Sequence, residues 1–326
     1  MTPPARPARP AGPARDALRR NAGHVASVGL VLMWSSGFVG AVLGTRAGGT
    51  PLQLLGWRFT ILGVGLALVA LLLRVDLSDR RAWGRQALLA LLCQAGYLFL
   101  VFEGISRGVN GGTAALIAAL QPLLVATVAG RLLGERTTAG MWIGMLLGMA
   151  GVVVVVSGEL GAASTAAAPW WAYLFPAAGM LSLATGTVLT QRLRPPEGLM
   201  QSITMQSVVT GVVLMAAATL TGQVVPPTDT GFWAAVLWLV CLSTLGGYVL
   251  YVFVTRTQGA TVVSVLLYLT PPTTMVWVML MFGVPITLWA VVGMAVSAVG
   301  VVTVLRSRPG AAARRARQRE IREAGR

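Results

Sequence analysis

A seven-residue motif occurs twice in this chain, and both copies lie inside long apolar segments. Residues 96–102 read GYLFLVF, and residues 247–253 read GYVLYVF, an offset of 151 positions. A duplicated unit made of apolar segments indicates a repeated set of membrane helices, an architecture in which a site forms between the two halves. The sequence therefore predicts an all-α integral membrane protein built from two related halves.

Ten apolar windows of about 20 residues, the length that crosses a bilayer as a helix, divide the chain. Only 11% of the residues are charged, whereas a soluble domain carries about 25%. The windows lack period-two alternation, which favours helices over β-strands. We expect membrane spans at residues 24–44, 51–73, 83–102, 109–132, 141–157, 169–189, 200–221, 232–254, 260–282 and 287–305.

The arginines predict the orientation of these spans. All 25 basic residues are arginines. If the N-terminus is cytoplasmic, all but Arg46, Arg58 and Arg107 fall on the cytoplasmic side, as the positive-inside rule requires. We therefore expect a multi-pass protein of the cell (inner or plasma) membrane with both termini in the cytoplasm.

Both ends of the chain, residues 1–23 and 306–326, are basic and have few apolar residues to bury, so we expect them to be disordered. A net charge of +15 also raises nucleic-acid binding by the C-terminal arginines as an alternative. The sorting of arginines by loop favours topology anchors and contacts with anionic lipid instead. The expected partner is thus the lipid bilayer, with no nucleic acid.

The similarity between the halves extends beyond the repeated motif. Leu120-Gln121-Pro122 recurs as Leu269-Thr270-Pro271 at an offset of 149. The predicted organisation is a first five-helix repeat at 24–157, an outer linker at 158–168 and a second repeat at 169–305. Because five is an odd number, the repeats are expected to be inverted in the membrane, which favours alternating access to a central site. A duplicated scaffold without a cavity is the alternative.

The few polar side chains within the expected spans are the candidates to line such a cavity, because a polar group in a bilayer must find a partner or water. Tyr97 and Tyr248 are equivalent by the repeat, and Gln94 lies one turn before Tyr97. Interhelical hydrogen bonding is the alternative role for each residue. The candidates for contact with a small-molecule substrate are Trp34, Ser36, Gln94, Tyr97, Gln121, Tyr248, Tyr268 and Thr270, with Ser35 and Gln206 as further central polar groups.

Charged residues and prolines add candidates for gating and coupling. Arg58 lies within a span, where it suits a structural or gating role or contact with an anionic substrate group. Glu103 is read as the only acid near membrane depth and so as the candidate for proton coupling, although an i,i+4 pair with Arg107 at the outer surface is the alternative. Pro122 and Pro271 interrupt equivalent helices, and matched interruptions are typical of a binding site between repeats.

Other classes of function find little support in the sequence. A catalytic site at membrane depth needs a nucleophile, an acid–base pair or a metal-ligand cluster, and we find none, so we expect no enzyme activity, metal or cofactor. Cys93 and Cys241 fall within spans and suggest no disulfide framework. The absence of a Walker motif argues against an ATP-driven pump. Glycines at 144, 148, 151, 293 and 300 are spaced for helix packing, with dimerisation through those helices as an alternative.

In the order of its motifs, the chain resembles the EamA-type transporters of the drug/metabolite transporter superfamily. The motifs that carry the resemblance are Trp34-Ser35-Ser36-Gly37-Phe38, Arg58-Phe59, Gln121-Pro122-Leu123, Leu133-Gly134-Glu135-Arg136 and the run from Ser264 to Pro271. It extends over about residues 25–305. The chain departs from the family pattern at Gly283-Val284-Pro285, where a second Gly-Glu pair often stands.

This resemblance implies an inner-membrane exporter of small metabolites, amino acids or toxic compounds, with a cavity lined mainly by helices 1, 3, 4, 6, 8 and 9. The main hypothesis is a secondary transporter that exports a small amphipathic or zwitterionic metabolite. A drug or xenobiotic efflux carrier and a non-transporting scaffold or receptor are the alternatives.

Overall fold

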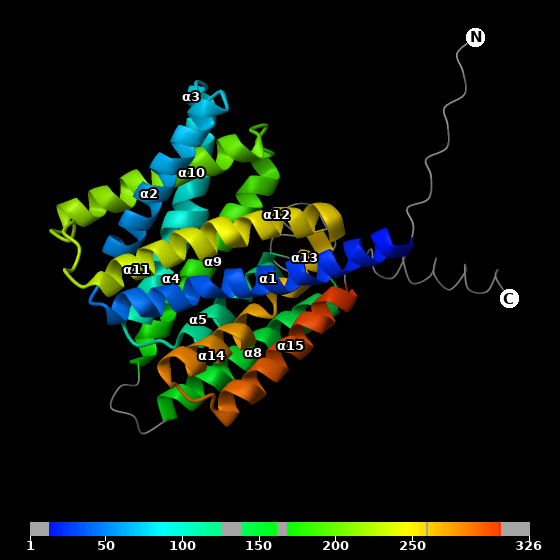
Figure 1. Cartoon of the computed structure of the whole chain (residues 1–326). Helices are drawn as coiled ribbons and strands as arrows, with labels where there is room; N and C mark the ends of the chain where they lie inside the picture. The colour runs from blue at the N-terminus through cyan, green and yellow to red at the C-terminus, as the bar shows by residue number, and fades with distance from the viewer. Residues whose placement is uncertain (1–12, 126–137, 162–167, 259, 308–326) are drawn as a thin grey trace, which may run out of the picture.

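The computed structural model describes residues 13–125, 138–161, 168–258 and 260–307, and in these segments the chain is helical without any strand (Figure 1). The helical elements of the first half are α1 (Pro13–Arg46), α2 (Pro51–Leu72), α3 (Arg80–Ala90), η1 (Leu91–Gly96), α4 (Tyr97–Ser106), α5 (Gly111–Ala118), α6 (Gln121–Leu124) and α8 (Ala139–Gly161). Those of the second half are η3 (Trp170–Tyr173), α9 (Leu174–Leu193), α10 (Leu199–Leu220), α11 (Thr230–Trp238), η4 (Leu239–Gly246), α12 (Gly247–Gln258), α13 (Ala260–Leu267), α14 (Thr270–Phe282) and α15 (Leu288–Ser307).

Eight helical stretches are long and apolar enough to cross a membrane. The expected spans at 109–132 and 287–305 correspond to the shorter apolar helices Gly111–Leu124 and Leu288–Val304. Residues 126–132, and the motif at 133–136, lie outside the described residues. Helical structure is confirmed, and the count of ten membrane-crossing helices stays a prediction.

Helix ends follow local capping signals. Thr50 and Gln53 form a capping box at the start of α2, with reciprocal bonds between side chain and backbone. Asp79 and Asp229 accept backbone N–H bonds at the starts of α3 and α11. Helix α1 begins at Pro13, so it includes part of the tail that was expected to be disordered up to residue 23. Helix α8 runs to Gly161, past the expected end at residue 157.

The two halves pack against each other along their whole length. Helix α2 lies along α10 and α8 along α15, and each of these two pairs joins equivalent helices, while α5 packs against α14 of the other half (Figure 1). Helix α1 packs against η4 and α12, and its counterpart α9 packs against η1 and α4. Many of the helix contacts therefore have a counterpart in the other half, although α1 also contacts α4 and α5 without an equally extensive counterpart at α9.

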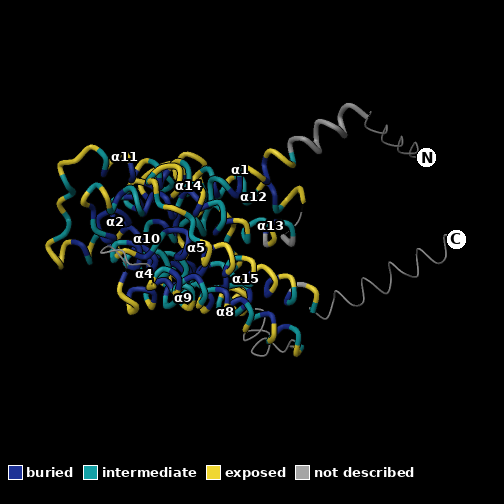
Figure 2. Tube along the Cα trace, turned by 90° about the horizontal axis from the view of Figure 1, so that it is seen from below, coloured by how far each residue is buried: buried dark blue, intermediate teal, exposed yellow. Residues whose placement is uncertain are grey.

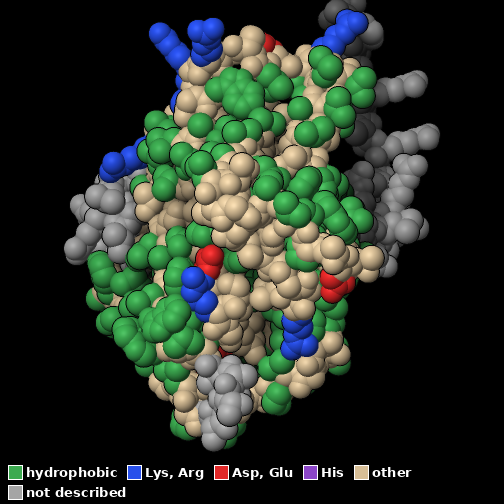
Figure 3. Space-filling view, turned by 90° about the vertical axis from the view of Figure 1, so that its left-hand side faces the viewer, with side chains coloured by type: hydrophobic (Ala, Val, Ile, Leu, Met, Phe, Trp, Pro, Cys, Tyr) green, Lys and Arg blue, Asp and Glu red, His purple; other side chains and the backbone are tan. Residues whose placement is uncertain are grey.

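Side-chain burial is that expected of a protein with an apolar environment. Buried positions gather between the helices, while outward positions are exposed (Figure 2). Many of the exposed side chains are large and apolar, such as Leu72, Leu220 and Leu280. On the face drawn in Figure 3, charged side chains are few; basic ones project at the upper end, and an acidic one lies beside a basic one near the middle. A wide apolar surface of this kind suits contact with lipid tails.

Each half contains two irregular backbone segments at equivalent positions. The π-helix η1 ends at Gly96, the first residue of the first copy of the repeated motif, and η4 ends at Gly246, directly before the second copy. The helix pairs α5–α6 and α13–α14 are interrupted at residues 119–120 and 268–269, immediately before the segments that contain Pro122 and Pro271. The matched interruptions expected from the prolines are therefore present in the structure.

Candidate functional site

A cavity of about 370 Å³ lies between the two halves, within the range of about 300–1,000 Å³ of small-molecule sites. Both halves contribute to its walls. Ten residues that the sequence singled out line it, namely Trp34, Arg58, Gln94, Tyr97, Gln121, Pro122, Gln206, Tyr248, Tyr268 and Thr270. The structure thus brings together side chains that are up to about 240 positions apart in the chain.

The irregular backbone segments form part of the cavity wall. Segment η1 contributes Cys93 and Gln94, and η4 contributes Ser243 and Thr244. A π-helical turn displaces backbone carbonyls from their usual partners, and π-turns are frequent at functional sites. Hydroxyl groups satisfy two of these carbonyls, since Ser182 Oγ donates to Leu92 O (2.8 Å) and Thr244 Oγ1 donates to Leu239 O (2.9 Å). Ser182 belongs to α9 and Thr244 to η4 itself. One irregular turn is therefore stabilised by a neighbouring helix and the other by one of its own side chains.

Aromatic rings form one side of the cavity. The ring of Trp34 stacks on Tyr251 at 5.8 Å between centroids, and Tyr251 stacks on Tyr248 at 6.4 Å. Trp34 and Tyr248 line the cavity themselves. Stacked rings provide a flat apolar surface with polar edges, which suits an amphipathic ligand.

A ladder of amide side chains joins the cavity to one end of the molecule. Gln94 Nε2 donates to Gln206 Oε1 (3.1 Å), Gln206 Nε2 donates to Gln86 Oε1 (2.7 Å), and Gln86 Nε2 donates to Glu197 Oε2 (3.1 Å). Thr210 Oγ1 donates to Gln94 Oε1 at 3.1 Å. The ladder holds α3 and η1 against α10 by side-chain hydrogen bonds, as is common between membrane helices.

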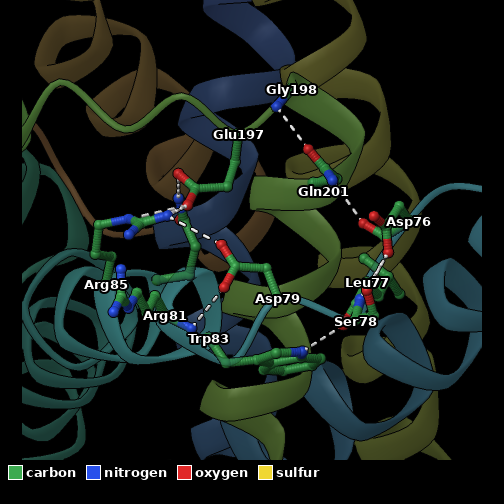
Figure 4. A network of polar contacts seen from close by, with 11 residues as sticks. Asp76, Leu77, Ser78, Asp79, Arg81, Trp83, Arg85, Glu197, Gly198 and Gln201 are labelled. Atoms are coloured by element: carbon green, nitrogen blue, oxygen red, sulfur yellow. Dashed lines mark hydrogen bonds and ion pairs between the residues drawn. The ribbon is translucent and has the colours of Figure 1, made fainter.

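The ladder ends in a charged cluster outside the cavity (Figure 4). The Arg85 guanidinium donates to Glu197 from Nε (3.0 Å) and from Nη2, and it also contacts Asp79 Oδ2 at 3.5 Å. Burial of the Glu197 carboxylate opposes its ionisation, but the hydrogen bonds from Arg85 and Gln86 outweigh this effect and lower the pKa of Glu197. The pair ties the connection between α9 and α10 to the start of α3.

Arg58 enters the cavity from α2 and is held by a hydroxyl group. Its Nε and Nη2 atoms donate to Thr244 Oγ1 at 3.1 Å and 2.8 Å. The arginine is 5% exposed, and its Nη1 atom is buried without a hydrogen-bond partner among the described residues. This contact joins α2 of the first half to η4 of the second.

Four predicted residues lie away from the cavity wall. Ser35 is fully buried, and its hydroxyl donates to the carbonyl of Thr270 at 3.4 Å. Ser36 is fully buried, and its hydroxyl donates to the carbonyl of Met33 at 2.6 Å. Pro271 is buried at the start of α14, behind Thr270. Glu103 forms an ion pair with Arg107, one turn further along the helix. The expected i,i+4 pair is thus present, and Glu103 does not line the cavity.

Glu103 is not the only acid that lies within a helix long and apolar enough to cross a membrane. Glu159 lies in the last turns of α8, inside a helix long enough to cross a membrane. Its carboxylate accepts hydrogen bonds from the Thr113 hydroxyl and from the Tyr173 hydroxyl (2.7 Å). The expected span ended at residue 157, so Glu159 was assigned to the outer linker. Only the longer helix reveals that this carboxylate is packed among protein side chains.

Gln206 and Thr244 also gain importance from the tertiary structure. Gln206 was recognised as a central polar group but was not among the substrate-contact candidates, and Thr244 has no motif that marks it. The repeat contained a signal for Thr244, since it lies four residues before Tyr248, as Cys93 lies four before Tyr97. Among the described residues, His, Cys, Asp and Glu do not gather into groups of three that could hold a metal ion.

Comparison with known proteins gives a consistent result. The model of the EamA-like transporter family matches two segments, residues 21–157 and 170–306. The protein "Uncharacterized inner membrane transporter YedA" of Escherichia coli K12 is 28% identical over 229 residues, which cover 70% of this chain and 72% of the relative. Proteins of the same name from strains O6:H1 and O157:H7 match to the same extent.

A solved crystal structure of a protein matches 89% of this chain and 99% of its own chain, with a TM-score of 0.59 and 21% identity. At this identity the likeness shows the fold alone.

Proposed function

This chain belongs to the EamA-like transporter family, and we propose that it is a secondary transporter that exports a small amphipathic or zwitterionic metabolite, such as an amino acid or a related compound. The observation that carries the proposal is the cavity between the halves, which is lined by stacked aromatic rings, amides, hydroxyls and one guanidinium. Apolar faces and neutral polar groups together suit a ligand that is partly apolar and partly polar. The family match points to a transporter and away from an enzyme.

The mechanism that we propose is alternating access between two inverted five-helix repeats. Equivalent helices of the two halves pack against each other, and the irregular segments occur in matched pairs. Two halves of similar sequence can exchange conformations and so open the cavity first to one side and then to the other. The amide ladder and its charged end join α3 to α10 on one side of the cavity. A change between the two states would have to break these hydrogen bonds.

The protein is a multi-pass membrane protein, and we propose the inner membrane as its location, with both termini in the cytoplasm. The name of the Escherichia coli relative supports this membrane. The beginning of α1 and the end of α15 lie on the same side of the molecule (Figure 1), which supports a common side for the two termini. The arginine distribution favours the cytoplasm as that side.

The proposal is tested by comparing the metabolites released from cells that overproduce the wild type with those released from cells that produce the double variant Gln121→Ala, Tyr248→Ala at equal membrane levels. Both residues line the cavity from different halves. We expect one or more compounds to accumulate outside only in the wild-type culture. Equal release across amino acids and related metabolites would contradict metabolite export, and release of added dyes or drugs alone would favour a xenobiotic carrier.

A further inference from the structure

The cavity contains a single formal charge. Among its described lining residues, Arg58 is the only one with an ionised side chain, and the others are apolar, aromatic, amide, thiol or hydroxyl groups. An arginine guanidinium remains protonated in proteins. A cation within a membrane-spanning helix is costly, and such residues characteristically contact a substrate, an ion or a specific partner. Arg58 is therefore expected to have a binding partner of one of these kinds.

The protein orients this guanidinium but does not neutralise it. Its two bonds both go to Thr244 Oγ1, a neutral acceptor, and none of the ion pairs among the described residues includes Arg58. Thr244 is itself fixed, because its hydroxyl proton is donated to the Leu239 carbonyl at 2.9 Å. The clamp thus holds Nε and Nη2 and leaves Nη1 without a hydrogen-bond partner in the part of the chain that the structure describes.

The buried Nη1 atom, unpaired among the described residues, has the chemistry of an anion-binding group. It belongs to a side chain that is 5% exposed and lines the cavity. A buried donor without an acceptor carries its full desolvation cost, which an incoming acceptor would remove. An ionised acceptor is favoured because charge-assisted hydrogen bonds are stronger than neutral ones.

We propose that Arg58 binds a carboxylate of the substrate through Nη1, so that the transported compounds are small carboxylates, zwitterionic amino acids among them. This inference rests on the proposed function and narrows its substrate class. One guanidinium balances one carboxylate, whereas a phosphate group carries a charge of about −1.5 to −2 at pH 7 and would remain partly uncompensated. The rings of Trp34 and Tyr248, each stacked on Tyr251, offer a surface for the apolar part of the ligand.

The test measures binding rather than transport, with purified protein in lipid nanodiscs. Three probes of similar size differ only in the head group, namely phenylacetate, phenylacetamide and benzylphosphonate. We expect phenylacetate to raise the Tm of the wild type more than the other two at equal concentration. Arg58→Gln should weaken phenylacetate binding about 10- to 100-fold, and the matched control Arg46→Gln, an exposed arginine over the Phe282 ring, should leave it unchanged.

Equal shifts with phenylacetate and phenylacetamide in the wild type would overturn the proposal, as would undiminished phenylacetate binding in Arg58→Gln. A larger shift with benzylphosphonate would contradict the carboxylate assignment. If Arg58→Gln fails to fold, Arg58→Lys retains the charge without the planar fork and should bind phenylacetate with intermediate affinity. Selective binding of phenylacetate without metabolite release would contradict only the transport function, and metabolite release without such selectivity would contradict only the role of Arg58.

Discussion

Ser297 in α15 donates a hydrogen bond from its hydroxyl to the backbone carbonyl of Gly148 in α8, at 3.1 Å. The two positions are 149 residues apart, the offset that relates the two halves. The bond therefore joins equivalent positions where the last helices of the repeats cross. On either side of it Gly144 faces Gly300 and Gly151 faces Gly293, and the repeat converts one pair into the other.

This crossing predicts a strong sensitivity to side-chain size. A Cβ atom at Gly151 would overlap the Gly293 carbonyl and the Ser297 hydroxyl, so we expect Gly151→Ala to destabilise the protein by about 1–3 kcal/mol. Gly65 in α2 has open space around its Cα atom, and Gly65→Ala should be neutral or slightly stabilising. Thermal unfolding of both variants in the same detergent provides the measurement, and equal Tm values would contradict the predicted overlap.

The Arg85–Glu197 pair predicts a pH-dependent stability. Because the pKa of Glu197 is lowered in the folded protein, its stabilisation is present above the ordinary glutamate pKa of about 4.3 and is lost as the pH falls through the lowered value. We expect the wild type to have a Tm a few degrees above that of Glu197→Gln at neutral pH, with the difference shrinking towards zero in acid. A difference that does not change between pH 3 and pH 7 would show that the charge of Glu197 is not the cause.

The amide ladder predicts that two substitutions in α10 lower stability alike but differ in their effect on transport. Gln206 makes two side-chain hydrogen bonds, to Gln86 and Gln94, and lines the cavity. Gln201 in the same helix also makes two, to the Gly198 amide and the Asp76 carbonyl, outside the cavity. We expect Gln206→Leu and Gln201→Leu to lower the free energy of unfolding by similar amounts, about 0.5–1.5 kcal/mol for each lost bond, and so to lower the Tm similarly.

Only Gln206→Leu should also reduce metabolite release per protein molecule. This comparison requires equal membrane levels of the two variants. Equal losses of release in both would indicate that reduced stability alone explains the effect, whereas full release in Gln206→Leu would exclude a role for the ladder in transport.

The variant Glu103→Gln tests whether this carboxylate couples transport to protons. Its carboxylate is paired with Arg107 and is absent from the cavity wall. We expect Glu103→Gln to retain most metabolite release and its response to a pH gradient across the membrane. The measurement is release from cells at several external pH values, with Glu159→Gln as the matched variant of the other membrane-depth acid. If Glu103→Gln alone abolished the response to pH, the coupling role expected from the sequence would be supported.

Some residues that the sequence predicts for the cavity lie there in the structure, and others do not. Tyr97 and Tyr248 were paired by the repeated motif, and Gln121 and Thr270 by the shared Leu-x-Pro motif, and all four lie on one cavity. Ser36 belongs to a recognisable motif, but its hydroxyl donates a hydrogen bond to the backbone of its own helix. A motif identifies the helix, but the direction of a side chain depends on which neighbouring helix lies opposite.

The sequence by itself determined the all-helical membrane character, the two related halves and the helix interruptions at the prolines, because each depends on local composition or on comparison of the chain with itself. The tertiary structure alone decided that Thr244 clamps Arg58, that Gln206 links Gln86 to Gln94 and that Glu159 is enclosed by Thr113 and Tyr173. These contacts join residues that are 14 to 186 positions apart. Their partners are fixed by how the helices pack, which is a property of the whole chain rather than of any segment.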